Sequence, residues 1–188
     1  MSSAPPPESY LFAPTPHVPN SRLPVLIYRS VLPANPTAAS TRATLEKNAW
    51  TQGGVFKTYR AHHFHSVTHE CYAVFKGESR LLLGRGPLDR EEDGGAVEVD
   101  LRRGDVIVLP AGVSHCSVSS DGEYEYVGLY PEGSPHWDNN FCKAGTEETE
   151  KKASIAGAVP IPAEDPVYGK DGPLVEIWRK AAEEAEEG

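Results

Sequence analysis

Short apolar runs separated by turn residues dominate the pattern along most of the chain. β-Branched and aromatic positions recur in these runs, several alternate with polar positions, and Gly, Pro, Asp and Ser stand between them. The pattern predicts strands at residues 23–32, 55–64, 70–76, 79–84, 96–101, 106–109, 115–118 and 124–130. Many short strands at this spacing indicate an all-β fold, a single antiparallel sandwich or barrel.

Three segments depart from the strand pattern. Residues 41–50 predict a short helix that Ser40 or Thr41 caps, with Leu45 and Trp50 packing against the barrel. Residues 174–187 predict a C-terminal helix with one apolar patch and an acidic end. We therefore expect an extended or partly disordered N-terminal arm (1–22), a barrel (23–131) and a C-terminal extension that packs on the barrel (132–188), with 145–152 as a charged connector.

Composition narrows the function classes. The formal net charge of −9 argues against nucleic acid and anionic membrane surfaces as partners. No apolar run approaches the length of a membrane span, and the N-terminus lacks the pattern of a signal peptide. The three cysteines are an odd number and have no paired spacing, which indicates reduced thiols. We therefore expect a cytoplasmic protein.

Candidate chemistry is concentrated in residues 62–70, which contain four of the seven histidines and one carboxylate. On a strand, His63 and His65 would face the same way. Glu70 follows just beyond a short turn, and imidazole with carboxylate suits iron, manganese, nickel, copper or zinc. This stretch predicts the start of a site for one divalent transition metal.

A second stretch can complete this site. Residues 104–115 form an apolar strand that ends at Pro110 and Gly112 and is followed by His115. If the next strand pairs near the first stretch, His115 supplies a third nitrogen ligand.

The two stretches resemble the paired motifs of the cupin superfamily. The first reads H-x-H-x4-E-x6-G from His63 to Gly77, and the second reads G-x5-P-x-G-x2-H from Gly104 to His115. Lys57 stands where the first motif usually has a glycine, and Ser119 where the second often has an asparagine. The resemblance implies a jelly-roll barrel and the metal ligands His63, His65, Glu70 and His115.

The resemblance extends to the YjlB-like single-domain subgroup of cupins over roughly residues 8–178. It rests on segments outside the two motifs: 23–28, 62–63, 165–169 and 172–174. No reaction is established for that subgroup, so the resemblance implies a fold and a site but no substrate.

Two alternatives within the site stay open at this point. His69 could replace Glu70 as a ligand, although the spacing from Glu70 to Gly77 favours Glu70. The loop 134–138, with His136 and Trp137, could line the pocket, but a packed surface loop is the favoured interpretation.

Three functions compete. The intact ligand set favours a metal-dependent oxygenase-type enzyme acting on a small organic molecule in the barrel pocket. A metal-stabilised, non-catalytic cupin that binds a small molecule is the first alternative, and an isomerase or epimerase of similar fold is the second. The long N-terminal arm also predicts a homodimer.

Overall fold

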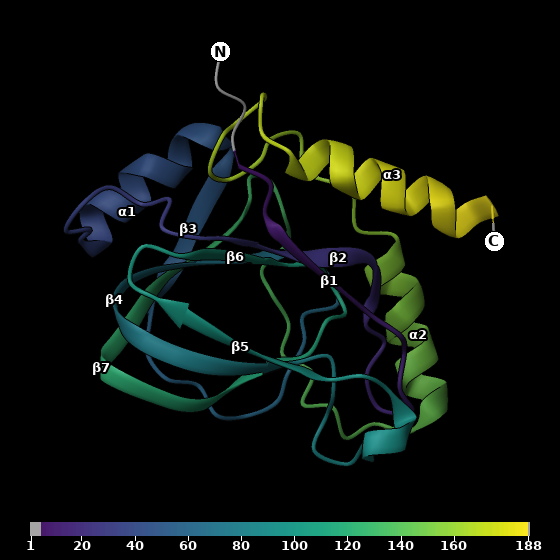
Figure 1. The fold of residues 1–188 in the computed structure, drawn as a ribbon. Coiled ribbons are helices and arrows are strands. Elements are labelled where there is room, and N and C mark those ends of the chain that lie inside the picture. The colour runs from purple at the N-terminus through teal and green to yellow at the C-terminus, as the bar shows by residue number, and fades with distance from the viewer. Residues whose placement is uncertain (1–4, 188) are drawn as a thin grey trace.

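The computed structural model describes residues 5–187 and shows one strongly curled antiparallel sheet with helices on its outer side (Figure 1). The part of the predicted arm before residue 5 lies outside the described residues, as does Gly188. The strands are β1 (Glu8–Phe12), β2 (Ser21–Tyr28), β3 (Trp50–Phe56), β4 (Glu70–Leu83), β5 (Val97–Arg102), β6 (Val106–Leu109) and β7 (His115–Pro131). The helices are α1 (Ala38–Leu45), α2 (Thr146–Gly157) and α3 (Leu174–Glu187), with short 3-10 turns at Glu46–Asn48 and Glu91–Asp93.

The sheet order is β1-β2-β6-β4-β7-β3, and β5 pairs with the second half of β4. Each of these pairings is antiparallel. The predicted all-β barrel of jelly-roll type is therefore confirmed. Within residues 5–187, no helix is long and apolar enough to cross a membrane.

Two strands are longer than predicted. β4 runs through Gly77 and β7 runs through Gly122, where the sequence predicts turns between separate strands. Both glycines adopt positive φ angles, 64° and 62°, which L side chains disfavour. The β4–β7 register shifts between Lys76 and Glu78. Bulges thus bend the ladder without ending it.

Two predicted segments are corrected by the structure. The first helix begins at Ala38, not at residue 41, because the Thr37 hydroxyl caps it by accepting a 3.1 Å hydrogen bond from the Ser40 amide. It ends at Leu45, and Ala49 adopts a left-handed conformation that turns the chain into β3. The predicted connector 145–152 lies mostly within α2.

The N-terminal arm is also more ordered than predicted. β1 pairs with β2 from Glu8↔Ile27 to Phe12↔Ser21 and forms one edge of the sheet. β2 begins at Ser21, so it starts within the span 1–22 that the sequence assigns to the arm.

The core has two layers, one on each side of the sheet. The barrel interior is filled by large apolar side chains, including Ile27, Val74 and Ile107. The outer layer lies between the sheet and the helices and includes Leu26, Leu45 and Trp178. Because both faces of β2 and β6 are covered, these strands read as continuous apolar runs.

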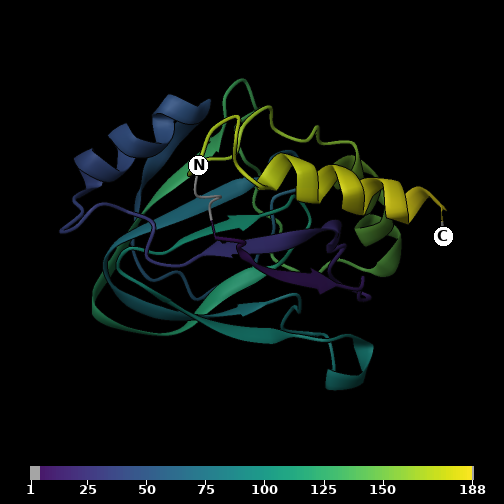
Figure 2. The same ribbon diagram turned by 45° about the horizontal axis from the view of Figure 1, so that its top comes forward.

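The C-terminal extension is fixed to the outer layer by polar contacts. Figure 2 shows α3 lying across the outer side of the barrel. The Trp178 indole donates to the Pro24 carbonyl at 2.9 Å, and the Tyr28 hydroxyl donates to the buried Asp165 carboxylate at 2.6 Å. Asp165 also accepts hydrogen bonds from three backbone amides, those of Val167, Tyr168 and Leu174.

Candidate metal centre

His63 and His65 come from an irregular segment between β3 and β4. The predicted strand 55–64 is wrong beyond Phe56, where β3 ends. His63 instead forms an isolated bridge with His115, and Phe64 forms one with Asn140. The two bridges hold the segment between β7 and the later loop, and the His63 and His65 rings lie 5.2 Å apart.

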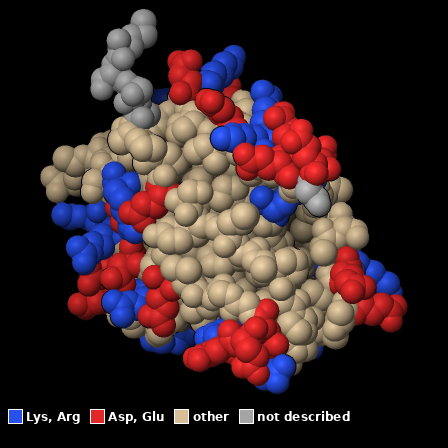
Figure 3. All heavy atoms as spheres, turned by 45° about the vertical axis from the view of Figure 1, so that its right-hand side comes forward, with Lys and Arg blue, Asp and Glu red and all other residues tan. Residues whose placement is uncertain are grey.

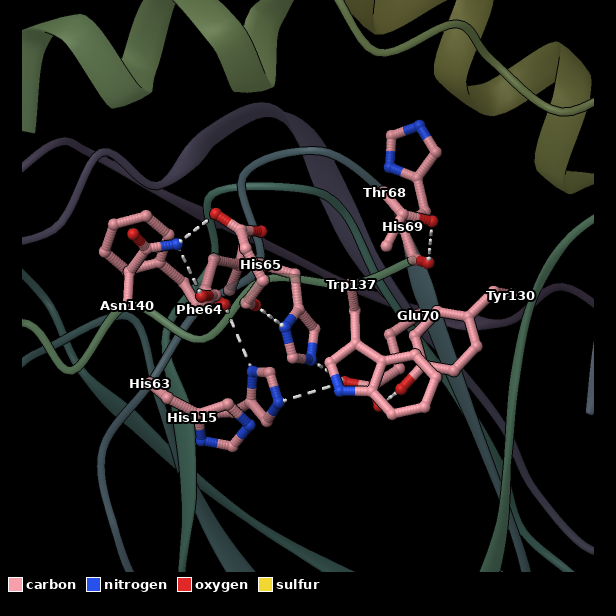
Figure 4. A network of polar contacts seen from close by, with 12 residues as sticks. His63, Phe64, His65, Thr68, His69, Glu70, His115, Tyr130, Trp137 and Asn140 are labelled. Carbon is pink, nitrogen blue, oxygen red and sulfur yellow. Dashed lines mark hydrogen bonds and ion pairs between the residues drawn. The ribbon is translucent and has the colours of Figure 1, made fainter. Parts of the chain in front are cut away.

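Glu70 and His115 are the first residues of β4 and β7, respectively. The His115 ring lies 4.3 Å from that of His63. Candidate donor atoms of His63, His65, Glu70 and His115 all lie within 4.8 Å of one another, and all four side chains are buried. The structure therefore brings together the four residues that the sequence predicts, as Figure 4 shows.

Each of the three imidazoles is oriented by its Nδ1 atom. Nδ1 lies next to a backbone carbonyl oxygen: that of Ala61 at 2.9 Å for His63, Asp138 at 2.5 Å for His65 and Val113 at 3.1 Å for His115. A carbonyl only accepts hydrogen bonds, so Nδ1 carries the proton and the neutral ring presents its lone pair at Nε2. Histidines that bind a metal through Nε2 usually donate the Nδ1 proton to such an acceptor.

The two oxygens of Glu70 have different surroundings. Oε1 accepts a hydrogen bond from the Tyr130 hydroxyl at 2.6 Å. Oε2 lies 2.8 Å from Nε2 of His65 and 3.2 Å from Nε2 of His115. With Nδ1 already protonated, this proximity is favourable only with an additional proton or a cation between the atoms.

The electrostatics of the cluster follow from burial and from Glu70. Burial alone would lower the pKa of His65, but the adjacent carboxylate raises it above its usual value. Burial would likewise raise the pKa of Glu70, but His65 and His115 hold it well below its usual range. Burial, with His115 beside it, lowers the pKa of His63 to about 3. The Glu70 carboxylate is therefore ionised and lies next to imidazole nitrogens that can bind a metal.

The donor set fits a divalent transition metal. Nε2 of His115 is buried and forms no hydrogen bond with any residue among 5–187, although it points toward Glu70. Such an orphaned nitrogen is costly unless it has a further partner. Three imidazoles and one carboxylate are ligands that iron, manganese, nickel, copper and zinc accept.

His69 points away from this cluster, toward the helices (Figure 4). Its Nδ1 accepts a hydrogen bond from the Ala111 amide at 3.0 Å, and its Nε2 lies 3.1 Å from the Pro160 carbonyl. Its ring lies 4.7 Å from that of Trp178. Burial lowers the pKa of His69 to about 4, so the ring is neutral at physiological pH. Glu70 rather than His69 therefore groups with the three other histidines.

A cavity of about 100 Å³ adjoins the cluster. Its walls are mostly aromatic and comprise Phe56, Tyr59, His63, His65, Glu70, Tyr72, Tyr126, Tyr130, Trp137 and Asn139. The rings of Tyr130 and Trp137 stack at 4.6 Å with an interplanar angle of 6°. The favoured surface-loop interpretation of 134–138 is thus wrong for Trp137 and Asp138, which line and support the site.

Sequence reasoning missed most of these wall residues. The alternation of Tyr124, Tyr126 and Tyr130 on β7 was the available signal, since alternate residues of a strand face the same side. No local pattern identifies Trp137, because it reaches the cavity through a loop.

Comparison with known proteins finds a relative that matches over nearly the whole length of the chain. No family model matches the chain. The "Uncharacterized protein YjlB" of Bacillus subtilis (strain 168) is 30% identical over 174 residues, which cover 92% of this chain and 97% of that protein. The fold and the His-His-Glu-His cluster define a cupin. Within that class, the chain belongs to the YjlB family.

Solved structures with partial similarity are more distant. RmlC from Streptococcus suis in complex with dTDP-D-xylose has a TM-score of 0.37 and 10% identity, covering 73% of this chain and 74% of that one. A mutant of Bacillus subtilis oxalate decarboxylase OxdC has a TM-score of 0.33 and 18% identity, and the match covers 62% of this chain but 27% of that one. The vicilin from Solanum melongena has a TM-score of 0.34 and 19% identity, with 70% and 32% covered. At these TM-scores the three structures carry no functional argument.

Proposed function

We propose that His63, His65, Glu70 and His115 bind one divalent transition metal, and that the protein is a metal-dependent oxygenase-type enzyme acting on a small organic molecule in the barrel pocket. One observation carries the proposal. All three imidazoles are tethered through Nδ1 to backbone carbonyls, and their Nε2 atoms converge with Glu70 in a buried cluster.

The chain's own residues prepare this centre in two ways. The carbonyl tethers fix the ring orientation before any metal binds, which lowers the cost of binding. The Tyr130 hydroxyl engages Oε1 of Glu70, leaving Oε2 as the oxygen that faces the nitrogens. When bound, a transition metal would supply Lewis-acid or redox chemistry to the adjoining cavity. Four protein donors leave coordination positions for a ligand on a five- or six-coordinate metal.

Two alternatives each have an observation in their favour. The small cavity, about 100 Å³, suits a metal-stabilised cupin that binds a small molecule without turnover. The His65–Glu70 contact at 2.8 Å, with Tyr130 beside it, suits a metal-independent isomerase or epimerase that transfers protons. An activity that requires metal would distinguish the oxygenase from the metal-independent isomerase. Oxygen consumption would distinguish the oxygenase from the non-catalytic binding protein.

The test is elemental analysis of protein purified without added metal. We expect near-stoichiometric iron, manganese, nickel, copper or zinc in the wild type and its loss in the His63→Ala/His115→Ala double variant. His136→Ala is the matched control, because His136 is exposed and lies outside the cluster. Oxygen uptake with candidate phenolic or diketone substrates follows. An absence of bound metal in wild-type protein, before and after incubation with these metals, would refute the centre.

A homodimer is part of the same proposal. β1 is an edge strand, and exposed edges are ready sites for pairing with another chain. Figure 3 brings forward the side of the molecule where α2 and α3 lie and shows a broad uncharged surface with charged residues around its margin. A groove of about 490 Å³ between β1, β2 and α2 has apolar walls that include Leu11 and Ile161. Light scattering of the purified protein tests the prediction.

A further inference from the structure

The cavity next to the proposed centre has a single acidic side chain in its walls, Glu70. Among the described residues that line it, there is no Lys, Arg or Asp. Histidines bind metals as neutral imidazoles, so a divalent ion with one carboxylate leaves a net charge of about +1. The described residues that line the cavity thus provide no Lys or Arg to pair with an anionic ligand.

Aromatic rings form the remaining walls. Tyr72 and Tyr126 stack at 3.9 Å with an interplanar angle of 22°, and Trp137 meets Phe56 edge-on at 6.3 Å. With the Tyr130–Trp137 stack, these pairs surround the cavity with ring faces and edges. Flat apolar groups pack well against such surfaces. The volume of about 100 Å³ also lies far below the roughly 300–1,000 Å³ of pockets for drug-sized ligands.

The phenol groups in the walls add hydrogen-bond donors but no charge. Tyr72, Tyr126 and Tyr130 line the cavity, and a tyrosine side chain is uncharged near neutral pH. The Tyr130 hydroxyl already donates to Glu70. A ligand in this cavity would therefore contact mainly aromatic rings. Its polar contacts would be limited to a few hydroxyls, Asn139 and the metal.

We propose, building on the metal centre above, that the substrate class is a planar molecule of about one ring that enters neutral or with a single negative charge, of the phenol type. One negative charge is balanced by the net charge of the centre. A dianion, such as a dicarboxylate or a phosphate ester, would leave a second buried charge without a partner, and burying an unpaired charge is strongly unfavourable.

Calorimetric titration of the full-length, Zn²⁺-loaded protein tests the inference. Zinc has no redox chemistry, so phenol is not oxidised during the titration. The probes are phenol, phenyl phosphate, which carries the same ring on a dianionic group, and oxalate, a dianion small enough for the cavity. We expect phenol to bind at least about tenfold more tightly than either dianion. Metal content is measured before and after each titration.

Wall variants locate the binding. Trp137→Leu and Phe56→Leu should each weaken phenol binding without changing zinc content, because both side chains line the cavity. Phe141→Leu is the matched control, since Phe141 is exposed and lies outside this cavity. Two wall variants are used so that a folding defect in one leaves the other informative.

The outcomes separate this inference from the proposed function. Zinc-loaded protein that binds oxalate or phenyl phosphate more tightly than phenol, or that binds no phenol, overturns the substrate class and leaves the metal centre intact. Phenol binding that both wall variants leave unchanged overturns it as well. Folded protein that holds no metal overturns the centre and this inference with it.

Discussion

Two buried carboxylates, Glu70 inside the barrel and Asp165 beneath the helices, are surrounded in opposite ways. Asp165 is fully buried, and both its oxygens accept hydrogen bonds, from the Tyr28 hydroxyl and three backbone amides. One oxygen of Glu70 accepts a hydrogen bond from the Tyr130 hydroxyl. The other lies next to Nε2 of His65 and of His115, two rings whose Nδ1 atoms are held by backbone carbonyls. Asp165, whose oxygens all accept hydrogen bonds from the protein, has a structural role. Glu70 lies next to nitrogen lone pairs, and this arrangement is favourable only with a bound cation or an additional proton.

The histidines repeat this contrast. His69 has partners for both ring nitrogens, whereas Nε2 of His115 has no hydrogen-bond partner within residues 5–187. Residue type and burial are the same in the two cases. For His69 and His115, the partner of the second nitrogen makes the difference: the described residues satisfy both nitrogens of His69 but only one of His115.

The largest effect on stability is expected for Asp165→Asn. The amide NH₂ replaces one acceptor oxygen that two donors require, so a buried network is broken at a cost of about 3 kcal/mol of unfolding free energy. Metal content per folded molecule should not change. Urea unfolding and elemental analysis measure the two quantities. Asp171→Asn is the matched control, because Asp171 is exposed in the same segment. Loss of metal without loss of stability would show that Asp165 acts on the centre.

A smaller effect is expected for His69→Phe. The aromatic ring keeps its packing against Trp178, but the Ala111 amide and the Pro160 carbonyl lose their partner, which costs about 2 kcal/mol. Because His69 points away from the cluster, we expect metal content close to that of the wild type. A folded His69→Phe variant without metal would instead make His69 a ligand and remove the distinction drawn between the two kinds of histidine.

The smallest effect is expected for Asp138→Asn. The Asp138 carboxylate accepts hydrogen bonds from the Ser66 amide, the Ser66 hydroxyl and Asn140, at 2.5–2.7 Å, and this holds the carbonyl that orients His65. Burial alone would raise the pKa of Asp138, but these donors lower it. Loosening the carbonyl that orients His65 should lower metal affinity about tenfold, or about 1.4 kcal/mol.

Competition with a chelator measures this affinity. Lys143→Ala, an exposed position in the same loop, is the control and should leave it unchanged. An Asp138→Asn variant with wild-type affinity would mean that the carbonyl stays in place without its side-chain anchor.

Much of the fold could be predicted from the sequence because its signals are local. The alternation on β5, the apolar run of β6 and the amphipathic pattern of α3 depend on neighbours within a few residues. Strand ends were harder to predict. The glycines at 77 and 122 have the same turn signal whether they end a strand or bend it, and only the facing strand decides.

The site shows the same division. The resemblance of the two motifs to those of cupins implied the four residues that cluster, and each of them lies at a strand end or next to a bridge. Trp137 and Asp138 could not be predicted, because Trp137 stacks on Tyr130 through an irregular loop and the Asp138 carbonyl meets His65, 73 positions earlier in the chain. Gly53 illustrates a third case. A Cβ there would overlap the Tyr130 ring and approach Trp137 at 2.8 Å, a requirement visible only once those rings are placed.

The bond from His65 to the Asp138 carbonyl also has a consequence for biosynthesis. It joins residues 73 positions apart, and its acceptor follows the last strand of the barrel. During synthesis from the N-terminus, the two histidines of the first motif and Glu70 emerge well before the loop that orients His65. The proposed metal site is therefore complete only after the chain beyond β7 has left the ribosome and docked, so metal binding in the final geometry would follow synthesis of this loop.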